Sequence, residues 1–204
     1  MSTYSKLQSN AYQKMAFNAG MALIGADAFV PSTGVVTESA ILGATTGGWQ
    51  FNAGINMSDL AEDVDNGKPG MKQFQRFSHS EPHVTGTLLT IDNGNVTKIM
   101  PGSTANTTDG VTKATPNGWF EDSDYFDLWI LTDYSTITSN QGVAQSGFFA
   151  IHMKNCLNVG GAQMQTNEDG KMTLPVDFRA FYDAENPDAE PYEIYFKPNV
   201  ASGE

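Results

Sequence analysis

One segment near the C-terminus constrains the fold more than any other part of the chain. Successive side chains of a β-strand point to opposite faces, so a strand with one buried face alternates apolar and polar residues. This segment does so over eleven positions, which predicts a half-buried strand. The apolar positions are Met172, Leu174, Val176, Phe178, Ala180 and Tyr182, and the positions between them begin Thr173, Pro175, Asp177 and Arg179.

A second alternating segment lies just before it. Phe149, Ile151 and Met153 alternate with Ala150, His152 and Lys154. The two segments are separated by a connection that contains Asn167-Glu168-Asp169-Gly170, a strong turn signal because glycine tolerates positive φ and Asn and Asp bond their own backbone. We expect the two strands to pair in an antiparallel manner. Neither carries a recognisable catalytic group, so they look like structural elements.

The composition also favours strands and turns. Hydrophobic residues make up 40% of the 204 residues, enough for a core, whereas charged residues make up only 17%, below the roughly 25% of typical soluble domains. Threonine, asparagine, serine and glycine fill the difference, and they favour strands and turns over helices. The chain is therefore predicted to be mainly β.

Further strands and connections follow from local patterns along the chain. A short helix is expected to end near Met100, before Pro101. Residues 57–80 and 102–118 contain glycine, proline and polar residues, which predicts a long loop or extended hairpin tip for the first and a loop for the second. Strands are expected at 21–24, 28–30, 83–91, 125–131 and 192–196, with an acidic connector at 183–191.

The ends of the chain are predicted to lie outside the main domain. Residues 1–20 begin with a polar segment without clear periodicity, which indicates an N-terminal arm, and residues 197–204 indicate a flexible tail. The β domain is then expected to span residues 21–196.

The charge balance bears on possible partners. The chain has 23 acidic and 11 basic residues, for a net charge of −12. It lacks the basic footprint with which proteins hold nucleic acid. The balance argues against DNA binding and is compatible with a surface along which DNA slides without adhering.

The single cysteine and the apolar pattern bear on the compartment. Cys156 has no second cysteine to pair with inside the chain, and no cysteine-based zinc site is possible. The N-terminal segment lacks the apolar core of a signal peptide, and no apolar run is long enough to span a membrane. We expect a protein made and folded in a reducing cytoplasm.

Two patterns superficially resemble metal sites. His79 and His83 are separated by Pro82, so they do not share a helix face, and no further ligand completes the set. Asp63, Asp65, Asn66 and Gly67 resemble part of a calcium loop, but the glycine is one position early and the closing glutamate is absent. Surface histidines and an acidic turn are the preferred interpretations, and we predict no metal and no cofactor.

Carboxylates and tryptophans supply two alternatives of a different class. Paired carboxylates do acid–base work in glycosidases, but charge runs beside strands are usually solvated faces, so we predict no enzyme. The three tryptophans would suit a sugar-binding platform of a β-sandwich module, although packing in the core or an interface is the stronger interpretation for Trp49 and Trp129. The carboxylates are Glu121, Asp122, Asp124, Asp127 and Asp133, and the third tryptophan is Trp119.

The order of several weak motifs resembles the major tail proteins, or tail tube proteins, of long-tailed bacteriophages and prophages. The resemblance covers roughly residues 20–196, although the segment 101–120 is longer and richer in threonine and asparagine than the resemblance predicts. The motifs are Leu42 to Phe51 (LGATTGGWQF), Gly67 to Lys72 (GKPGMK), Val84 to Leu89 (VTGTLL), Phe149 to Leu157 (FAIHMKNCL), Gly160-Gly161, Phe178 to Asp183 (FRAFYD) and Pro191 to Phe196 (PYEIYF).

This resemblance implies a β-sandwich or split barrel of antiparallel strands with one short flanking α-helix. It implies a structural virion protein of the tail, assembled in the host cytoplasm from homohexameric rings stacked into a hollow tube. DNA passes through such a tube without specific binding, and the implied partners are other copies, the tape measure and the tail terminator. The main alternative is a carbohydrate-binding or capsid-decoration module with a β-sandwich fold.

A tail tube also needs contacts between rings and a lumen that does not hold phosphate. We expect the loop 57–80 and the N-terminal arm at the ring–ring contacts, and polar faces of the central strands at the lumen. The candidate ring–ring residues are Asp59, Glu62, Asp63, Asp65, Lys68, Lys72 and Phe74, and the candidate lumen-facing residues are Thr173 and Asp177.

Overall fold

A computed structural model describes residues 16–61, 64–134, 147–166 and 170–197. Antiparallel strands dominate it, and a single short α-helix, α1 (Val96–Ile99), follows a 3-10 turn. The strands are β1 (Ala16–Ile24), β2 (Phe29–Val30), β3 (Val35–Val36), β4 (Thr45–Asp59), β5 (Gln75–Leu88), β6 (Ser103–Thr108), β7 (Val111–Pro116), β8 (Phe126–Tyr134), β9 (Phe148–Asn158), β10 (Gln165–Thr166), β11 (Met172–Ala180) and β12 (Tyr192–Lys197).

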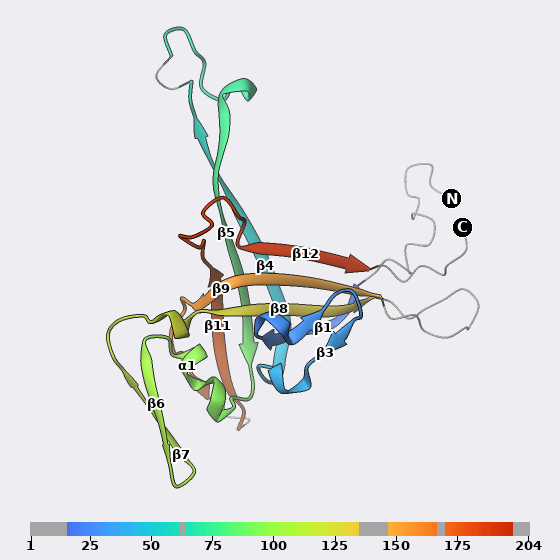
Figure 1. The fold of residues 1–204 in the computed structure, drawn as a ribbon, viewed down its shortest axis with the longest axis vertical. Coiled ribbons are helices and arrows are strands. Elements are labelled where there is room, and N and C mark those ends of the chain that lie inside the picture. Colours follow the sequence, from blue (N-terminus) through green and yellow to red (C-terminus); the bar gives the residue numbers. More distant parts are fainter. Residues whose placement is uncertain (1–15, 62–63, 135–146, 167–169, 198–204) are drawn as a thin grey trace, which may run out of the picture.

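The main sheet has the order β1-β8-β9-β11-β5-β4, with β12 paired to β9 and β10 paired to β11. In Figure 1, β8, β9 and β12 run across the view, whereas β4, β5 and β11 run along it. The sheet turns at the pairing of β9 with β11, so its two halves face each other across a core, as in orthogonally packed sheets. The predicted fold class, a mainly β sandwich-like domain with one short helix, is confirmed.

The alternation that predicts β11 is confirmed by burial. Leu174, Val176, Phe178 and Ala180 are buried, and the residues between them are half-buried on the other face. Phe178 is fully buried, and its ring packs against Trp49 and edge-on against Phe126. The apolar face of this strand is therefore the centre of the core.

The expected pairing of the two alternating segments is confirmed only at their ends. β9 and β11 are antiparallel, but the pairs run only from Phe178↔Asn158 to Ala180↔Cys156. The segment Phe149–Met153 pairs instead with β8 on one side and with β12 on the other. β9 has eleven residues, so one of its sides has room for β12 at Phe148–Met153 and for β11 at Cys156–Asn158.

The segment 102–118 is not a loop, contrary to the sequence-based expectation. It forms the β6–β7 hairpin, which lies apart from the main sheet (Figure 1). Asp109 and Gly110 connect the strands and both have positive φ, 52° and 78°, as a two-residue hairpin turn requires. Threonines favour strands, and the Asp-Gly pair was the available turn signal.

The boundaries of the domain also differ slightly from the expected ones. The described part of the N-terminal arm, residues 16–20, belongs to β1, so these residues are part of the body and the expected boundary at residue 21 is wrong. Residues 1–15 lie outside the described residues. At the other end, Lys197 is the last residue of β12, and residues 198–204 of the predicted tail lie outside the described residues.

A glycine on β5 makes room for the ring of Trp49. A Cβ added at Gly86 would lie only 2.3 Å from Cε3 of Trp49, a separation at which something must move. We therefore expect Gly86→Ala to lower the free energy of unfolding by about 1–3 kcal/mol, as overpacked cores do. Urea denaturation measures this change.

Gly54 on β4 is the matched control, because an added Cβ there meets no atom within 4 Å and its φ is not positive. Gly54→Ala is expected to change the unfolding free energy by less than about 0.5 kcal/mol. Equal effects of the two substitutions would contradict the close packing of Trp49 on Gly86.

Candidate functional site

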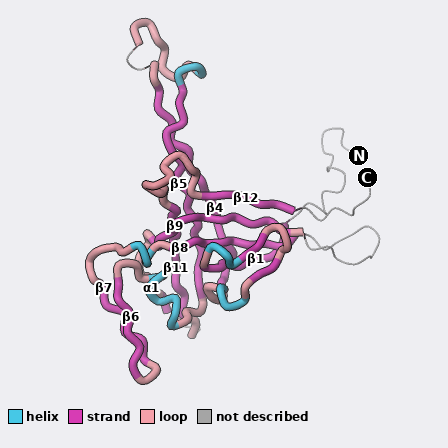
Figure 2. Tube along the Cα trace, viewed as in Figure 1, coloured by secondary structure: helices cyan, strands magenta, loops and turns pink. Residues whose placement is uncertain are grey.

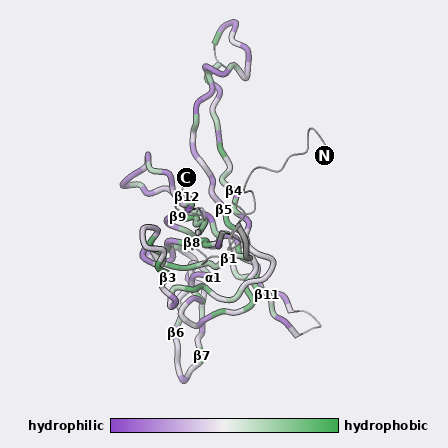
Figure 3. Tube along the Cα trace, turned by 90° about the vertical axis from the view of Figure 1, so that its right-hand side faces the viewer, coloured by the Kyte–Doolittle hydropathy of each residue, from purple (hydrophilic) through white to green (hydrophobic). Residues whose placement is uncertain are grey.

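The outer half of the β4–β5 hairpin projects from the body of the domain. We call residues 55–79 the arm. Figure 1 shows it at the top of the molecule, and Figure 3, turned by 90°, shows it projecting there as well. Figure 2 shows strand in the part of the arm next to the body, and loops with a short helical turn at the tip. The predicted loop 57–80 is therefore an extended hairpin tip, one of the two forms expected, with residues 57–59 and 75–80 in the strands.

One face of the arm is apolar and uncovered. Met57 pairs with Phe77, and Ile55 lies two residues from Met57 on β4. Paired residues of an antiparallel ladder share a face, as do residues two apart on a strand. Met57 is 65% exposed, Ile55 64% and Phe77 48%. These three side chains, the apolar strip, continue the core face of β4 beyond the body.

The base of the arm is fixed to the body by hydrogen bonds. The backbone N–H of Ser80 donates to the hydroxyl of Tyr182 at 2.8 Å, and the Ser80 hydroxyl donates to Glu190 Oε2 at 2.5 Å. Tyr182 also donates to Glu190, at 3.0 Å. Ser80 is buried. These bonds join the arm to the acidic connector before β12 and fix the direction in which the arm leaves the body.

Asp59 organises the tip of the arm. Its two carboxylate oxygens accept hydrogen bonds from the backbone N–H groups of Gly70, at 2.7 Å, and Ala61, at 2.9 Å. The bond from Gly70 and then the bond from Ala61 hold the pKa of the Asp59 carboxyl below its ordinary value. One side chain thus joins the two sides of the tip.

Asp59→Ala is expected to loosen the tip, because both N–H groups lose their acceptor. Limited trypsin digestion measures the effect at Lys72, which is exposed and followed by glutamine. Cleavage there should be several-fold faster than in the unmodified protein. Asp65→Ala is the control, since Asp65 is exposed and its substitution should leave the rate unchanged.

The same contact has a defined pH dependence. A carboxyl with a lowered folded-state pKa contributes stability above its unfolded value, about 3.9 for Asp. That contribution is lost as the pH falls through the lowered pKa of Asp59. In an NMR titration, the amide resonances of Ala61 and Gly70 should move with a midpoint below about 3.9. A midpoint at or above that value would contradict the two bonds.

Most of the predicted contact residues lie at the arm tip. Phe74 is half-buried and its carbonyl accepts from the N–H of Leu60. Lys68 and Lys72 are exposed and make no ion pair within the part of the chain that the structure describes. Glu62 and Asp63 lie outside the described residues. Asp63 is part of the segment that resembles a calcium loop, so that segment is only partly described.

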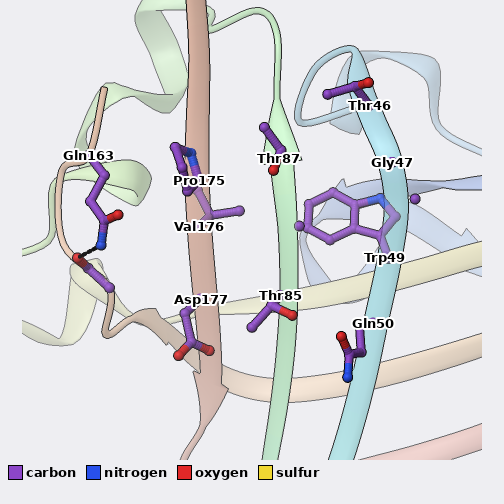
Figure 4. A pocket seen from close by; sticks show the side chains of 13 residues that line it. Thr46, Gly47, Trp49, Gln50, Thr85, Thr87, Gln163, Pro175, Val176 and Asp177 are labelled. Atoms are coloured by element: carbon purple, nitrogen blue, oxygen red, sulfur yellow. Dashed lines mark hydrogen bonds between the residues drawn. The ribbon is translucent and has the colours of Figure 1, made fainter. Parts of the chain in front are cut away.

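A second surface is the polar face of β4, β5 and β11. It holds a hollow of about 420 Å³, whose lining residues include Gln50, Thr85, Thr87 and Asp177 (Figure 4). Asp177 pairs with Thr85, and Thr85 pairs with Gln50, so polar side chains form rows across the three strands. Asp177 lies on this face, while Thr173 donates its hydroxyl to the carbonyl of Gln165 at 3.3 Å. Their exposure to a lumen stays a prediction.

Charges of both signs lie on this polar face. His83 Nδ1 is 3.0 Å from Asp177 Oδ1, and Arg179 donates to Glu81 at 3.3 Å. His79 is 3.4 Å from the same oxygen of Glu81. His79 and His83 thus each have a carboxylate partner, and they do not converge on one point. Among the described residues no group of three or more His, Cys, Asp or Glu is placed to hold a metal ion.

The carboxylates considered for catalysis are separated by their structural roles. Glu121 and Asp124 form a capping box around the 3-10 turn at Asp122–Asp124. Asp127 accepts from Nε2 of the buried His152 at 3.0 Å, and this bond, more than any other contact, lowers the pKa of Asp127. Asp133 is exposed at the other end of β8. Glu121 and Asp124 therefore stabilise a turn, and Asp127 holds His152 of the neighbouring strand.

The three tryptophans do not form one platform. Trp129 is buried, donates to the carbonyl of Ala26 at 3.1 Å and stacks on His152. Trp49 packs against the core, and only Trp119 is largely exposed. The interpretation of Trp49 and Trp129 as packing residues is confirmed.

The apolar strip of the arm was missed from the sequence, although a signal was present. Phe51, Ala53, Ile55 and Met57 alternate with Asn52, Gly54 and Asn56, which is a strand pattern extending past the body.

Comparison of the sequence with known protein families finds no family that matches, and no curated protein matches either. No helix among the described residues is long and apolar enough to cross a membrane.

Proposed function

We propose that the chain is a structural subunit that assembles with copies of itself, as the tail tube proteins of long-tailed bacteriophages do. In this proposal subunits form rings, and the rings stack into a hollow tube of the virion tail through which DNA passes. The arm of each subunit lies at the contact between neighbouring rings. The tape measure and tail terminator are the further partners.

The observation that carries the proposal is the uncovered apolar strip on the projecting arm. Three large apolar side chains that are 48–65% exposed are costly to leave in water, at about 25 cal/mol per Å² of apolar surface. Exposed apolar patches of this kind commonly mark protein–protein contacts. A projecting hairpin is suited to a neighbouring subunit because it extends beyond its own body.

Two further features agree with a subunit of a tube. Within the described ranges β12 pairs only with β9, and its side chains Ile194 and Phe196 are exposed. The edge of a strand is a ready site for pairing with another chain. The polar face of β4, β5 and β11 offers a surface without a basic patch, and the net charge of −12 opposes phosphate binding. A tube map with Thr173 and Asp177 buried between subunits would contradict their predicted exposure to the lumen.

Shortening the arm tests the proposal. Asp59 and Gln75 are paired, so deleting residues 60–72 and changing Gln73→Asn and Phe74→Gly leaves a two-residue hairpin turn in register. We expect the unmodified protein to pellet in the ultracentrifuge above a threshold concentration and the shortened variant to stay in the supernatant. Equal pelleting of both would contradict a role for the tip, residues 60–74, in the contact; the apolar strip, which this variant retains, is tested by its own substitutions.

A further inference from the structure

An apolar pocket opens into the domain between the two halves of the sheet. We call it the inner pocket. Its volume is about 500 Å³, within the range of roughly 300–1,000 Å³ that is typical of small-molecule sites. β1 and β4 line its outer part, where Ala19 and Gly47 are exposed. Its floor belongs to the core and is formed by the buried side chains of Val84, Ile130 and Ile151.

Irregularities in β1 and β4 shape the opening of the inner pocket. The register of β1 shifts after Phe17, and that of β4 shifts after Thr46. Such bulges bend a strand locally. The two strands nevertheless come close, because a Cβ added at Gly48 would lie 3.4 Å from the carbonyl oxygen of Ala19. The pocket therefore opens where two bent strands from opposite halves of the sheet approach each other.

The lining of the inner pocket is uncharged. Among the described residues that line it, none is Asp, Glu, Lys, Arg or His, and the polar side-chain groups are the Thr132 hydroxyl and the Trp49 indole N–H. The Thr132 hydroxyl donates to the carbonyl of Phe149 at 3.4 Å. An ion in this pocket would lose its hydration without gaining a partner of opposite charge. The lining thus favours an uncharged molecule.

The indole N–H of Trp49 has no such acceptor. Its nitrogen is buried and lacks a hydrogen-bond partner among the described residues, although a buried tryptophan N–H usually has one and an unmet donor costs free energy. The Cδ1 atom bonded to this nitrogen lies 3.5 Å from the place of a Cβ on Gly20 of β1, whereas Cε3 faces Gly86 on β5. In Figure 4 the nitrogen lies on the side of the indole toward Gly47. The nitrogen edge is therefore turned toward β1 and the opening of the pocket.

We propose that the inner pocket binds a small, uncharged, largely apolar molecule that carries a hydrogen-bond acceptor such as a carbonyl oxygen. The apolar part of the molecule packs on the floor of Val84, Ile130 and Ile151, and its acceptor receives the indole N–H of Trp49. The ligand thus covers apolar surface and satisfies the buried donor at once. This inference does not rest on the proposed self-assembly, because the arm does not line the pocket.

Benzophenone is a suitable probe for this site. It is uncharged and has one carbonyl acceptor, and on irradiation its carbonyl carbon bonds to a nearby carbon by insertion into a C–H bond. The unmodified full chain is irradiated with increasing concentrations of benzophenone, and mass spectrometry identifies the labelled residues. We expect saturable labelling, half-complete at roughly 100 µM, at residues 47–51, 84, 130–132 and 149–151.

A substitution tests the role of the N–H separately from that of the apolar floor. Trp49→Phe removes the donor and keeps an aromatic ring. Half-complete labelling should then need about fivefold more benzophenone, the effect of one lost hydrogen bond. Trp119→Phe is the matched control, because Trp119 is exposed and lies outside the pocket. It should leave the concentration unchanged.

An NMR measurement on the unmodified chain does not depend on the folding of any variant. Benzophenone should move the Nε1–H resonance of Trp49 downfield, and diphenylmethane, which lacks the carbonyl, should move it less. The Nε1–H resonance of Trp129 is an internal control that should stay in place, because this group already donates to the carbonyl of Ala26 at 3.1 Å.

The outcomes separate the pocket from its recognition of an acceptor. Labelling that is spread over the surface without saturation, or no labelling up to the solubility limit of benzophenone, would overturn the inner pocket as a binding site. Saturable labelling of the pocket with equal half-saturation in Trp49→Phe, or equal shifts with benzophenone and diphenylmethane, would overturn the N–H as the recognition group. Pelleting tests self-assembly independently of these results.

Discussion

Replacing Met57 and Phe77 together by serine is expected to prevent assembly while the body stays folded. Fully burying one large exposed apolar side chain is worth about 1.5–3 kcal/mol. Met57 is 65% exposed and Phe77 48%, so each contact would lose roughly 2–3 kcal/mol, which corresponds to about 30- to 150-fold in affinity. Both side chains are largely exposed in the isolated subunit. Their loss should therefore have little effect on thermal unfolding.

Pelleting and the unfolding temperature, measured on the same preparation, test this expectation. Val111→Ser is the matched control, because Val111 is an equally exposed apolar residue, on the β6–β7 hairpin. It should pellet like the unmodified protein. Assembly of Met57→Ser/Phe77→Ser at the concentration that suffices for the unmodified chain would show that the apolar strip is not the contact.

Phe178→Ala is expected to be the most destabilising single substitution in the body. Phe178 is fully buried and lies between Trp49 and Phe126, where the two halves of the sheet meet. Truncating a buried phenylalanine to alanine costs about 3–5 kcal/mol, from lost burial and the cavity left behind. Urea denaturation of the purified variant measures the change.

Two companion variants make the result interpretable. Phe178→Leu keeps most of the volume and should lose less, so it gives a value even where Phe178→Ala does not fold. Phe196→Ala removes the same ring from an exposed position on β12, and its effect should stay within about 0.5 kcal/mol. Similar losses for Phe178→Ala and Phe196→Ala would contradict the assigned core.

The parts of the fold that the sequence predicted are those encoded by local periodicity. The alternation from Met172 to Tyr182 specifies both a strand and its buried face, because side chains alternate with a period of two whatever the neighbours are. The short helix before Pro101 was likewise predicted from local signals. These features need no knowledge of which strand pairs with which.

The parts that the sequence did not predict depend on distant contacts. Nothing local indicates that one side of β9 borders β8, while its other side borders β12 at Phe148–Met153 and β11 at Cys156–Asn158. The composition of the segment 102–118 predicts a loop because threonine and asparagine occur in both loops and strands. The turn signal Asp109-Gly110 is local, but the pairing of Ser103 with Pro116 and its successors is what shows the hairpin.

The sequence predicted an extended segment at residues 57–80, and the structure shows it as the outer part of the β4–β5 hairpin; its place at a ring–ring contact stays a prediction. The expectation for residues 57–80 focused on charged residues, of which Asp59 proves to bind the backbone of its own tip. The exposed apolar strip of Ile55, Met57 and Phe77 was not recognised, because exposure depends on how far the hairpin extends beyond the body. That extent is set by the register of β4 against β5.

Negative-stain electron microscopy of the purified unmodified chain over a concentration series tests whether the protein assembles with itself. We expect rings at low concentration and hollow tubes of uniform diameter above a threshold. Single dispersed particles at every concentration, including after addition of sheared fragments from any assembled material in the same preparation, would contradict self-assembly as the function of this fold.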